Sequence, residues 1–331
     1  MRDFEAPLEL ALQRFLAMRR QDAAAIDQRL GPLVDELESA VSARGKRLRP
    51  LLLAWGYRAG RGEVDDTLVR AAASLELLHT FALIQDDVMD RSTTRRGRQA
   101  SHVILAAAAE VEPDRFGPSA AILLGDLALI WADELFATAG FGPDQLGRAQ
   151  PFYNLLRTEV TLGQYLDVLA AHTRRVTEDQ ALTVNRYKTA SYTVQRPIQL
   201  GLALAGASDE LIEAVSAYAI PAGIAFQLRD DVLGAFGDPE VTGKPSGEDL
   251  RERKPTWLWA RTLRLCPKAE NVTDVATLRD LIVESGALSD AEEKIRSLGD
   301  EALDAARRLP VAPELVEELT SLTERLVWRR S

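Results

Sequence analysis

The sequence is poor in cysteine and lysine, and it has no excess of positive charge. Its single cysteine, Cys266, excludes a disulfide framework and a cysteine-rich zinc site, and suits a reducing compartment. The 50 acidic and 40 basic residues give a formal net charge of −10. This balance argues against nucleic acid as a partner, because nucleic-acid binding needs a basic face. Only six of the 331 residues are lysine, so each one present is a candidate for a function.

Uninterrupted hydrophobic segments are also missing. The longest apolar run, residues 120–136, contains three acidic residues, each of which is costly in the hydrocarbon core of a membrane. The first residues carry charges and an amphipathic stretch in place of a signal peptide. We therefore expect no integral membrane segment and a cytoplasmic protein.

Helical patterning runs through nearly the whole chain. Apolar residues recur at spacings of three and four, whereas sustained two-residue alternation and Asn-Gly hairpin signals are absent. The pattern predicts an all-α fold. No linker is long enough to divide the chain, so we expect one domain over residues 1–331. The predicted helices cover residues 8–26, 66–90, 119–139, 144–171, 178–206, 208–236, 255–265, 273–284, 289–308 and 313–328.

Two polar segments interrupt this pattern. Residues 91–102 hold four arginines and a glycine, and residues 237–255 hold three glycines and three prolines. Each segment follows an acidic cluster at the end of an apolar helix. Long loops inside a compact domain are often lids or binding loops, and we expect these two to be lids.

The first acidic cluster comprises Asp86, Asp87 and Asp90. On a helix, residues three and four apart project to one side, where like charges repel. Placing three carboxylates beside a core segment therefore favours a cation partner. Hard carboxylate oxygens suit Mg²⁺, which typically bridges to substrate phosphates. The second cluster, Asp230 and Asp231, follows another apolar stretch, and two such helices facing each other would form a carboxylate-walled cavity.

The basic residues narrow the chemistry further. Neither a Walker A pattern nor a dinucleotide-binding fingerprint is present, so a nucleotide enzyme is disfavoured. Basic residues instead occur in several different short motifs, spread along the chain. In their order, these motifs resemble the trans-isoprenyl diphosphate synthases (polyprenyl synthetases). The matches are GKRLRP at 45–50, LELLH at 75–79, DDVMD at 86–90, RRG at 95–97, GD at 125–126, GQYLD at 163–167, KTA at 188–190, FQLRDD at 226–231, and GK at 243–244 leading to Lys254.

The resemblance departs at three positions. Gly234 stands where the second motif usually has a third acid, Gln99 replaces a proline in the first lid, and Gln85 replaces a frequent histidine. None of these removes a group that the chemistry must have. The family's fold is a single all-α isoprenoid synthase domain of about ten core helices around a central cavity, usually a homodimer.

The resemblance implies a Mg²⁺-dependent condensation of isopentenyl diphosphate with an allylic diphosphate through a carbocation. Three Mg²⁺ ions, with Mn²⁺ as the alternative ion, would lie on Asp86, Asp90 and Asp230, with Asp87 and Asp231 in support. The residues expected to bind the allylic diphosphate are Arg95, Gln164, Lys188, Lys244 and Lys254. Those expected to bind isopentenyl diphosphate are Lys46, Arg49, His79 and Arg96. Gln227, Thr189 and the carbonyl of Lys188 would stabilise the carbocation.

Product length is expected to depend on the helix that carries Asp86. Ala82 and Phe81 lie four and five residues before it, about 6–7.5 Å along a helix. In the family, a large ring at the fifth position forms the floor of the cavity. Phe81 therefore predicts a short-chain product, geranylgeranyl diphosphate, with farnesyl diphosphate as the alternative.

Two other functions compete with this interpretation. A class I terpene cyclase shares the helical cavity, but does not need a second diphosphate site such as GKRLRP and His79 provide. A non-catalytic subunit of a heteromeric synthase tends to lose acids of the first motif, which this chain keeps. Four of the six lysines (46, 188, 244 and 254) fall in the motifs, as a polyanionic ligand requires.

Overall fold

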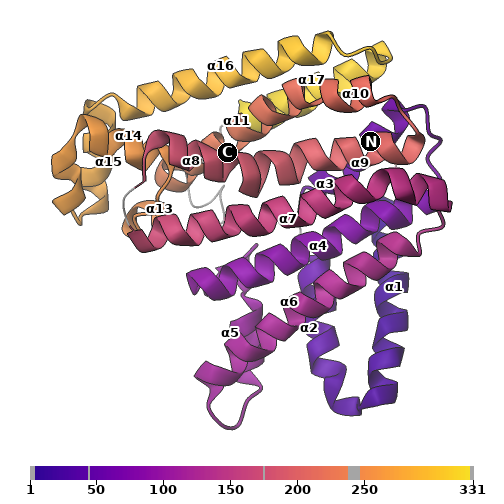
Figure 1. Ribbon diagram of the computed structural model, residues 1–331. Coiled ribbons are helices and arrows are strands. Elements are labelled where there is room, and N and C mark those ends of the chain that lie inside the picture. Colours follow the sequence, from indigo (N-terminus) through magenta and orange to yellow (C-terminus); the bar gives the residue numbers. More distant parts are fainter. Residues whose placement is uncertain (1–3, 44, 174–175, 238–246, 329–331) are drawn as a thin grey trace. The chain divides into compact units, whose positions relative to one another are not determined.

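The structure is a computed structural model that describes residues 4–43, 45–173, 176–237 and 247–328 (Figure 1). The chain divides into two compact units, Met1–Gly147 and Arg148–Ser331. The prediction of one domain over residues 1–331 stays a prediction.

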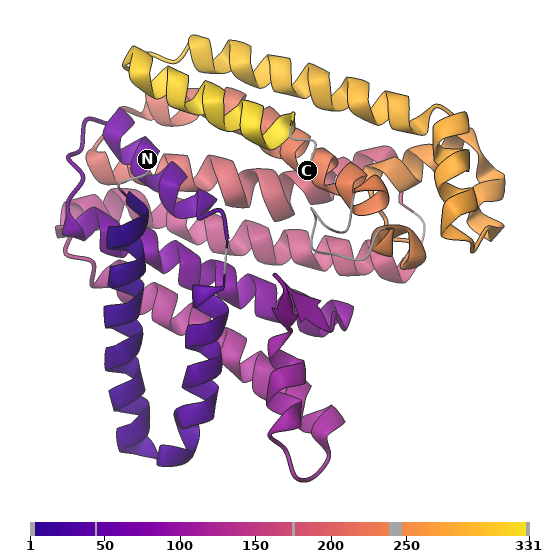
Figure 2. The same cartoon turned by 180° about the vertical axis from the view of Figure 1, so that it is seen from behind.

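The first unit is built from helices and one small hairpin. Figure 2 shows α1 and α2 as an antiparallel pair joined through the short helix η2. Two two-residue strands pair antiparallel between α4 and α5. The elements are α1 (Glu5–Ile26), η2 (Gln28–Leu30), α2 (Gly31–Ser42), α3 (Leu48–Ala59), α4 (Asp66–Asp90), β1 (Thr94–Arg95), β2 (Arg98–Gln99), α5 (Ser101–Ala107), α6 (Pro113–Ala137) and the start of α7 (Pro143–Thr173).

Helix α4 is the core of this unit. Its N-terminus is capped by Asp65, whose side chain accepts a hydrogen bond from the backbone N–H of Leu68 at 2.9 Å. Leu68, Leu75 and Leu78 are fully buried, and α4 lies along α6 (Figure 1). Gly125 of α6 leaves room for the Gln85 side chain of α4, because a Cβ there would lie 2.7 Å from the Gln85 amide nitrogen. Burial of this apolar helix fixes the position of the acidic cluster at its end.

The described residues of the second unit form helices joined by loops, with no strand. Its elements are the rest of α7, α8 (Glu178–Val184), the π-helix η3 (Asn185–Gln195), α9 (Arg196–Ala205), α10 (Asp209–Ala214), α11 (Ser216–Phe236), α13 (Glu248–Arg251), α14 (Trp257–Leu265), η4 (Pro267–Asn271), α15 (Val275–Glu284), α16 (Ala287–Arg307) and α17 (Pro313–Val327). Helix α11 packs against α16 and η3. A Cβ on Gly223 would collide with the backbone of Ala190, so α11 and η3 meet almost backbone to backbone.

The all-α prediction is confirmed, and most predicted helices match within a few residues. Several features differ. Helices α2, α3 and α5 lie outside the predicted ranges, and the predicted helix 208–236 is divided into α10 and α11. The predicted helix 178–206 contains the π-helix η3. The segment 91–102, predicted to be a lid, contains a hairpin that its polar sequence does not indicate. The hairpin turn consists of Arg96 and Gly97, which both have positive φ (53° and 76°), as two-residue turns with right-handed strand twist require.

Two helical segments, Asp66–Asp90 and Asp209–Phe236, are long and apolar enough to cross a membrane by length and composition. This is weak evidence for a span, because 67% and 50% of their most apolar windows are buried inside the protein, as in core helices.

Candidate active site

The first acidic cluster forms the C-terminal turn of α4. Asp87 is buried, Asp86 is half-buried and Asp90 is exposed. Negative charge is unfavourable at a helix C-terminus, where the unsatisfied carbonyls already carry partial negative charge. Burial raises the pKa of Asp87, although the neighbouring Arg95 opposes the shift. The turn therefore needs positive charge nearby to keep its carboxylates ionised.

Arg95 in strand β1 supplies part of that charge. Its Nε donates to Asp87 Oδ1 at 2.7 Å, and its Nη2 donates to Asp86 Oδ2 at 3.0 Å. A pair of charge-assisted hydrogen bonds therefore joins the segment after α4 to the acidic cluster.

The next residue, Arg96, turns to a different partner. Its Nη2 lies 2.9 Å from His79 Nε2, and its Nη1 donates to the carbonyl of Ala43 at 3.4 Å. Because a guanidinium can only donate, His79 Nε2 accepts this bond and the ring is neutral. Desolvation, followed by the charges of Arg49 and Arg96, holds the pKa of His79 well below its usual value. Gly45 leaves room for this arginine, since a Cβ there would lie 3.0 Å from its Nη1.

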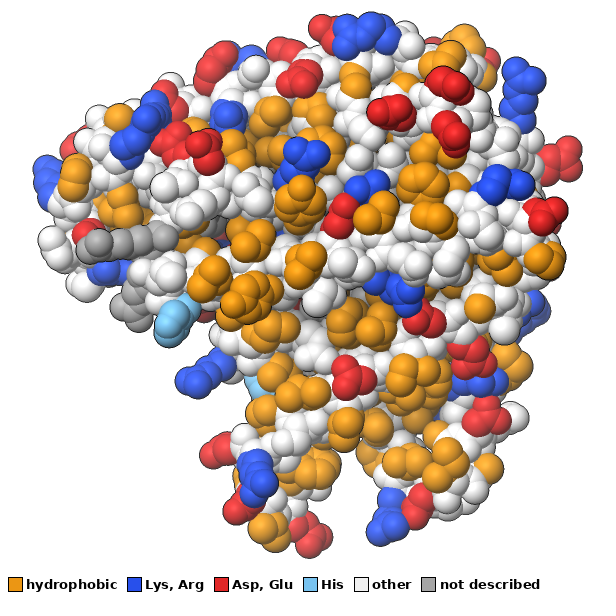
Figure 3. All heavy atoms as spheres, viewed as in Figure 1, with side chains coloured by type: hydrophobic (Ala, Val, Ile, Leu, Met, Phe, Trp, Pro, Cys, Tyr) orange, Lys and Arg blue, Asp and Glu red, His pale blue; other side chains and the backbone are white. Residues whose placement is uncertain are grey.

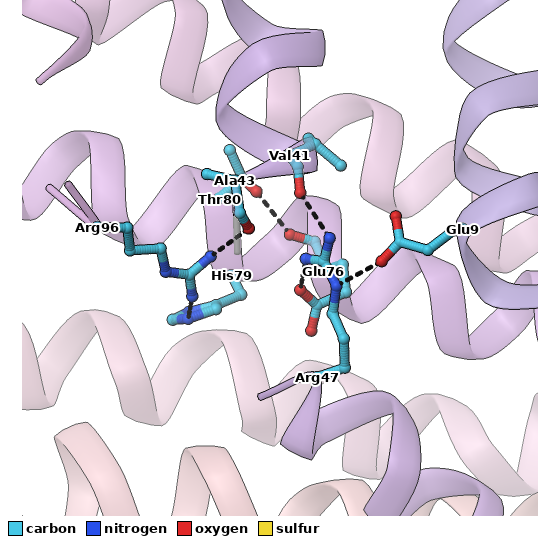
Figure 4. Close-up of polar contacts among 8 residues, drawn as sticks. All are labelled: Glu9, Val41, Ala43, Arg47, Glu76, His79, Thr80 and Arg96. Atoms are coloured by element: carbon cyan, nitrogen blue, oxygen red, sulfur yellow. Dashed lines mark hydrogen bonds and ion pairs between the residues drawn. The ribbon is translucent and has the colours of Figure 1, made fainter. Parts of the chain in front are cut away.

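The GKRLRP motif presents its three cations differently. Lys46 is exposed and Arg49 is half-buried, whereas Arg47 is buried and forms ion pairs with Glu9 and Glu76 (Figure 4). Lys46 and Arg49 therefore remain candidates for an anionic substrate. The predicted isopentenyl diphosphate residues Arg49, His79 and Arg96 lie in one positive region.

The base of the hairpin is fastened to α2. Arg98 Nη2 donates to Glu36 Oε2 at 2.5 Å, and the Ser101 hydroxyl donates to Glu36 Oε1 at 2.6 Å. Glu36 is only 5% exposed, so both of its oxygens are satisfied inside the protein. This anchor holds the hairpin so that its two arginines reach α4.

In the second unit, three predicted residues form a hydrogen-bonded chain. The Thr189 hydroxyl donates to Gln227 Oε1 at 2.7 Å, and Gln227 Nε2 donates to Asp231 Oδ1 at 2.8 Å. The chain fixes the orientation of the Gln227 amide. Thr189 lies in the π-helix η3, a geometry that frequently occurs at functional sites.

The burial and the hydrogen bonding of Asp231 are those of a carboxylate suited to a cation. It is 5% exposed, and its Oδ2 is buried without a hydrogen-bond partner. Burial raises the pKa of Asp231 to about 7, and Lys254 opposes the shift. A buried carboxylate oxygen of this kind, beside Asp230, fits a hard divalent ion.

The missing third acid of the second motif has a structural counterpart. A Cβ on Gly234 would collide with the carboxylate of Asp249, which therefore occupies the space that a side chain at position 234 would need. A larger residue at position 234 would require the carboxylate of Asp249 in α13 to move.

Lys188 pairs with an acid of another predicted motif, GQYLD at 163–167. Its Nζ donates to Asp167 Oδ2 at 2.6 Å. Gly163 allows α7 to approach η3 here, because a Cβ at 163 would lie 2.6 Å from the backbone nitrogen of Lys188. Gln164 is half-buried beside this contact in the sequence, and Lys254 is half-buried after α13. Lys244 lies outside the described residues.

The predicted metal ligands are carboxylates with suitable chemistry. Among the described residues, no three His, Cys, Asp or Glu side chains are gathered closely enough to hold an ion. The donors nevertheless fit Mg²⁺: Asp86 and Asp90 lie one helical turn apart, and Asp231 presents a buried oxygen next to Asp230.

Sequence reasoning missed several acids that hold the basic residues in place. Glu9, Glu36 and Glu76 pair with arginines from distant segments, and Asp249 fills the space at Gly234. Glu76 carried a usable signal, because a buried glutamate inside an apolar helix needs a cationic partner. The partners themselves are 29 to 62 residues away in sequence, and no local pattern names them.

Comparisons with known proteins agree with the resemblance in the motifs. The polyprenyl synthetase family profile matches residues 32–287. The chain is 34% identical to the geranylfarnesyl diphosphate synthase of Aeropyrum pernix, over 85% of this chain and 89% of that protein. It is 38% identical to the geranylgeranyl diphosphate synthase of Methanosarcina mazei, over 70% and 69%.

A solved structure is similar over nearly the full length. Geranylgeranyl pyrophosphate synthase of Corynebacterium glutamicum, crystallised with isoprenyl diphosphate and magnesium, has a TM-score of 0.95 and 36% identity, with 99% of each chain covered. Fold, motif order and the pairing of acidic with basic side chains thus lead to one assignment: this chain is a member of the polyprenyl synthetase family, the trans-prenyltransferases.

Proposed function

We propose that the protein condenses isopentenyl diphosphate head-to-tail with allylic diphosphates and releases geranylgeranyl diphosphate. One observation carries this proposal. Two adjacent arginines of one hairpin serve two different groups: Arg95 contacts the acidic turn, and Arg96 contacts His79. His79 lies seven residues before Asp86, about 10 Å along α4. A carboxylate region for metal-bound diphosphate and a basic region for a second diphosphate therefore flank the same hairpin.

The carboxylates are the proposed binding site of the allylic diphosphate, through metal ions. Asp86, Asp90 and Asp230 would hold three Mg²⁺ ions, with Asp87 and Asp231 supporting them and Mn²⁺ as an alternative. When bound, these ions supply the positive charge that stabilises the diphosphate leaving group. Arg95, Gln164, Lys188, Lys244 and Lys254 would add hydrogen bonds and charge to that group.

The cation formed on ionisation needs dipoles and no strong nucleophile. The Thr189–Gln227–Asp231 chain supports this role, because it orients the Gln227 amide through two hydrogen bonds. Thr189 and the carbonyl of Lys188 would contribute further dipoles. Lys46, Arg49, His79 and Arg96 would hold isopentenyl diphosphate while its alkene attacks, and the proton lost would pass to the released pyrophosphate.

Product length is proposed from α4. Phe81 and Ala82 are both half-buried, one and a half turns or less before Asp86. A large ring at 81 limits elongation and favours the twenty-carbon product, with the fifteen-carbon product as the alternative. The similar proteins named above include twenty-carbon and twenty-five-carbon synthases, which supports a short-chain product.

We also propose a cytoplasmic homodimer. The described residues include apolar side chains at heptad spacing on the outer face of α6, where Phe116, Leu123 and Ile130 are 48%, 64% and 60% exposed. Figure 3 shows hydrophobic side chains gathered over this helix. Such a stripe is typical of a surface that another helix covers.

The test is to incubate the purified protein with Mg²⁺, labelled isopentenyl diphosphate and each of three primers: dimethylallyl, geranyl and farnesyl diphosphate. We expect a twenty-carbon product that disappears with EDTA and with Asp86→Asn. Fifteen-carbon product alone would favour the farnesyl alternative. No condensation with any primer would reject the synthase function and favour a non-catalytic subunit.

A further inference from the structure

Arg47 is the one cation of the GKRLRP motif that the structure encloses. It is 7% exposed, and its guanidinium points towards three groups from three helices (Figure 4). Nε donates to Glu9 Oε1 of α1 at 2.8 Å, and Nη2 donates to the Val41 carbonyl of α2 at 2.9 Å. Nη1 donates to Glu76 of α4. The side chain thus fastens the residues around position 47 to all three helices.

The backbone at Arg47 explains why such a fastening is needed. Its φ of 46° places it in the left-handed region, and it directly precedes α3 with no side-chain cap. A non-glycine residue in that region costs about 1 kcal/mol or more and persists only when its surroundings enforce it. The hydrogen bonds of the guanidinium supply that enforcement.

The charges around Arg47 separate it from the substrate. Burial opposes its charge, and the carboxylates of Glu76 and Glu9 outweigh that effect, so the pKa of Arg47 stays above its usual value. Two acids surround one arginine, so this guanidinium offers no surplus positive charge to an anion. Its neighbours Lys46 and Arg49, which are more exposed, remain able to bind one.

Glu76 connects this cluster to the substrate residues. It lies one helical turn before His79 on α4, and its backbone carbonyl accepts a hydrogen bond from the Thr80 hydroxyl at 2.8 Å. Arg47 therefore links the turn that carries Lys46 and Arg49 to the turn that carries His79, which in turn holds Arg96.

We propose that Arg47 is a positioning residue for isopentenyl diphosphate: with Glu76 and Glu9 it fixes Lys46 and Arg49 relative to His79 and Arg96, without contacting substrate itself. This inference rests on the proposed function, which assigns those four residues to isopentenyl diphosphate. A displacement of about 1 Å in a binding constellation can cost up to about 10²-fold. Removing the link should therefore weaken the binding of isopentenyl diphosphate and leave the binding of the allylic diphosphate nearly unchanged.

The test is steady-state kinetics with both substrates varied. Arg47→Met should raise KM for isopentenyl diphosphate about tenfold or more and leave KM for the allylic diphosphate within about twofold. Arg47→Lys keeps the charge and should recover part of the affinity. Glu9→Gln, whose side chain is 38% exposed, should have a smaller effect of the same kind.

A paired variant separates positioning from stability. Arg47→Met alone leaves Glu76 buried and unpaired, which destabilises a protein strongly. Arg47→Met with Glu76→Leu replaces the buried ion pair by apolar groups, a change that is often neutral or stabilising. We expect this double variant to melt near the wild-type temperature and still show the raised KM for isopentenyl diphosphate.

Glu159→Gln is the matched control, because it breaks the Arg196–Glu159 pair, whose side chains are 15% and 13% exposed. It should change neither KM. An active wild type whose Arg47 variants keep KM for isopentenyl diphosphate, or whose double variant regains it, would overturn the positioning role alone. A wild type that condenses nothing would instead reject the proposed function.

Discussion

His79 is a hydrogen-bond acceptor because the guanidinium beside it can only donate. Burial and the surrounding arginines, Arg49 first among them, lower its pKa in the folded protein. In the unfolded chain its pKa is about 6.5. As the pH falls, His79 therefore binds a proton in the unfolded chain before it does so in the folded protein. The folded protein loses stability below about pH 6.5 for this reason.

His79→Gln tests this assignment. Glutamine keeps an acceptor for Arg96 but does not titrate, so the variant should lose less stability between pH 7 and pH 5 than the wild type. The difference should approach about 1.4 kcal/mol per pH unit below pH 6.5. Thermal denaturation over this range measures it. Parallel curves for the two proteins would show that folding does not lower the pKa of His79.

Phe81 is the residue to which product length is assigned. Phe81→Ala removes a ring from the helix that carries Asp86 and should shift the products beyond twenty carbons. The reciprocal change, Ala82→Phe, should shift them towards fifteen. Chromatography of the labelled products after phosphatase treatment measures both. Unchanged distributions in both variants would place the floor of the cavity on another helix.

Helix contacts depend on small residues that the sequence does not mark as special. Gly223 of α11 meets the backbone of Ala190 in η3, which carries Thr189. A methyl group there would force the two elements apart, and overpacking of this kind typically costs about 1–3 kcal/mol. The π-helix and the residues Lys188 and Thr189 would move with it.

Gly223→Ala should therefore lower the free energy of unfolding by about 1–3 kcal/mol and reduce kcat. Gly147→Ala is its control: this glycine lies inside α7 and a Cβ there meets nothing within 4 Å. That change should stabilise the protein by about 0.5–1 kcal/mol, because alanine favours a helix over glycine. Urea denaturation compares them, and equal effects would contradict the close approach of α11 and η3.

Most of the long helices and the motif positions were predictable, because the spacing of apolar and charged residues along a short stretch of sequence indicates them. The helix 66–90 is an example, and its acidic end matches α4. The hairpin was not predictable, because its turn uses an arginine at positive φ where asparagine is usual. That conformation is stabilised by His79 and Ala43, which are 17 and 53 residues away. The arginine partners of Glu9, Glu36 and Glu76 could not be predicted for the same reason, because they are distant in sequence.

At the scale of the whole molecule, net charge describes the site poorly. The chain carries −10, yet its proposed ligands are polyanions. In the first unit some acids pair with buried or half-buried arginines, as Glu36 does with Arg98 and Glu76 with Arg47, while Lys46 is exposed. Local charge and bound ions, which the formal sum omits, decide the partner.

The exposed stripe of α6 gives a prediction about assembly. Leu123→Glu with Ile130→Glu places charges on the stripe and should convert a dimer to a monomer, because unpaired charges are costly in a buried interface. Light scattering after size-exclusion chromatography measures the mass. Val111→Glu, at a side chain that is 76% exposed outside the stripe, should leave the dimer intact. A wild-type monomer would contradict the assembly.

In the proposed reaction two diphosphates react together: the allylic diphosphate ionises with the help of metal ions, and the alkene of isopentenyl diphosphate attacks. The most direct measurement is the release of pyrophosphate in the presence of Mg²⁺ with the allylic substrate alone, with isopentenyl diphosphate alone, and with both. We predict release only when both are present, with one pyrophosphate for each isopentenyl diphosphate consumed. Release from the allylic substrate alone, as a terpene cyclase would give, would contradict the account.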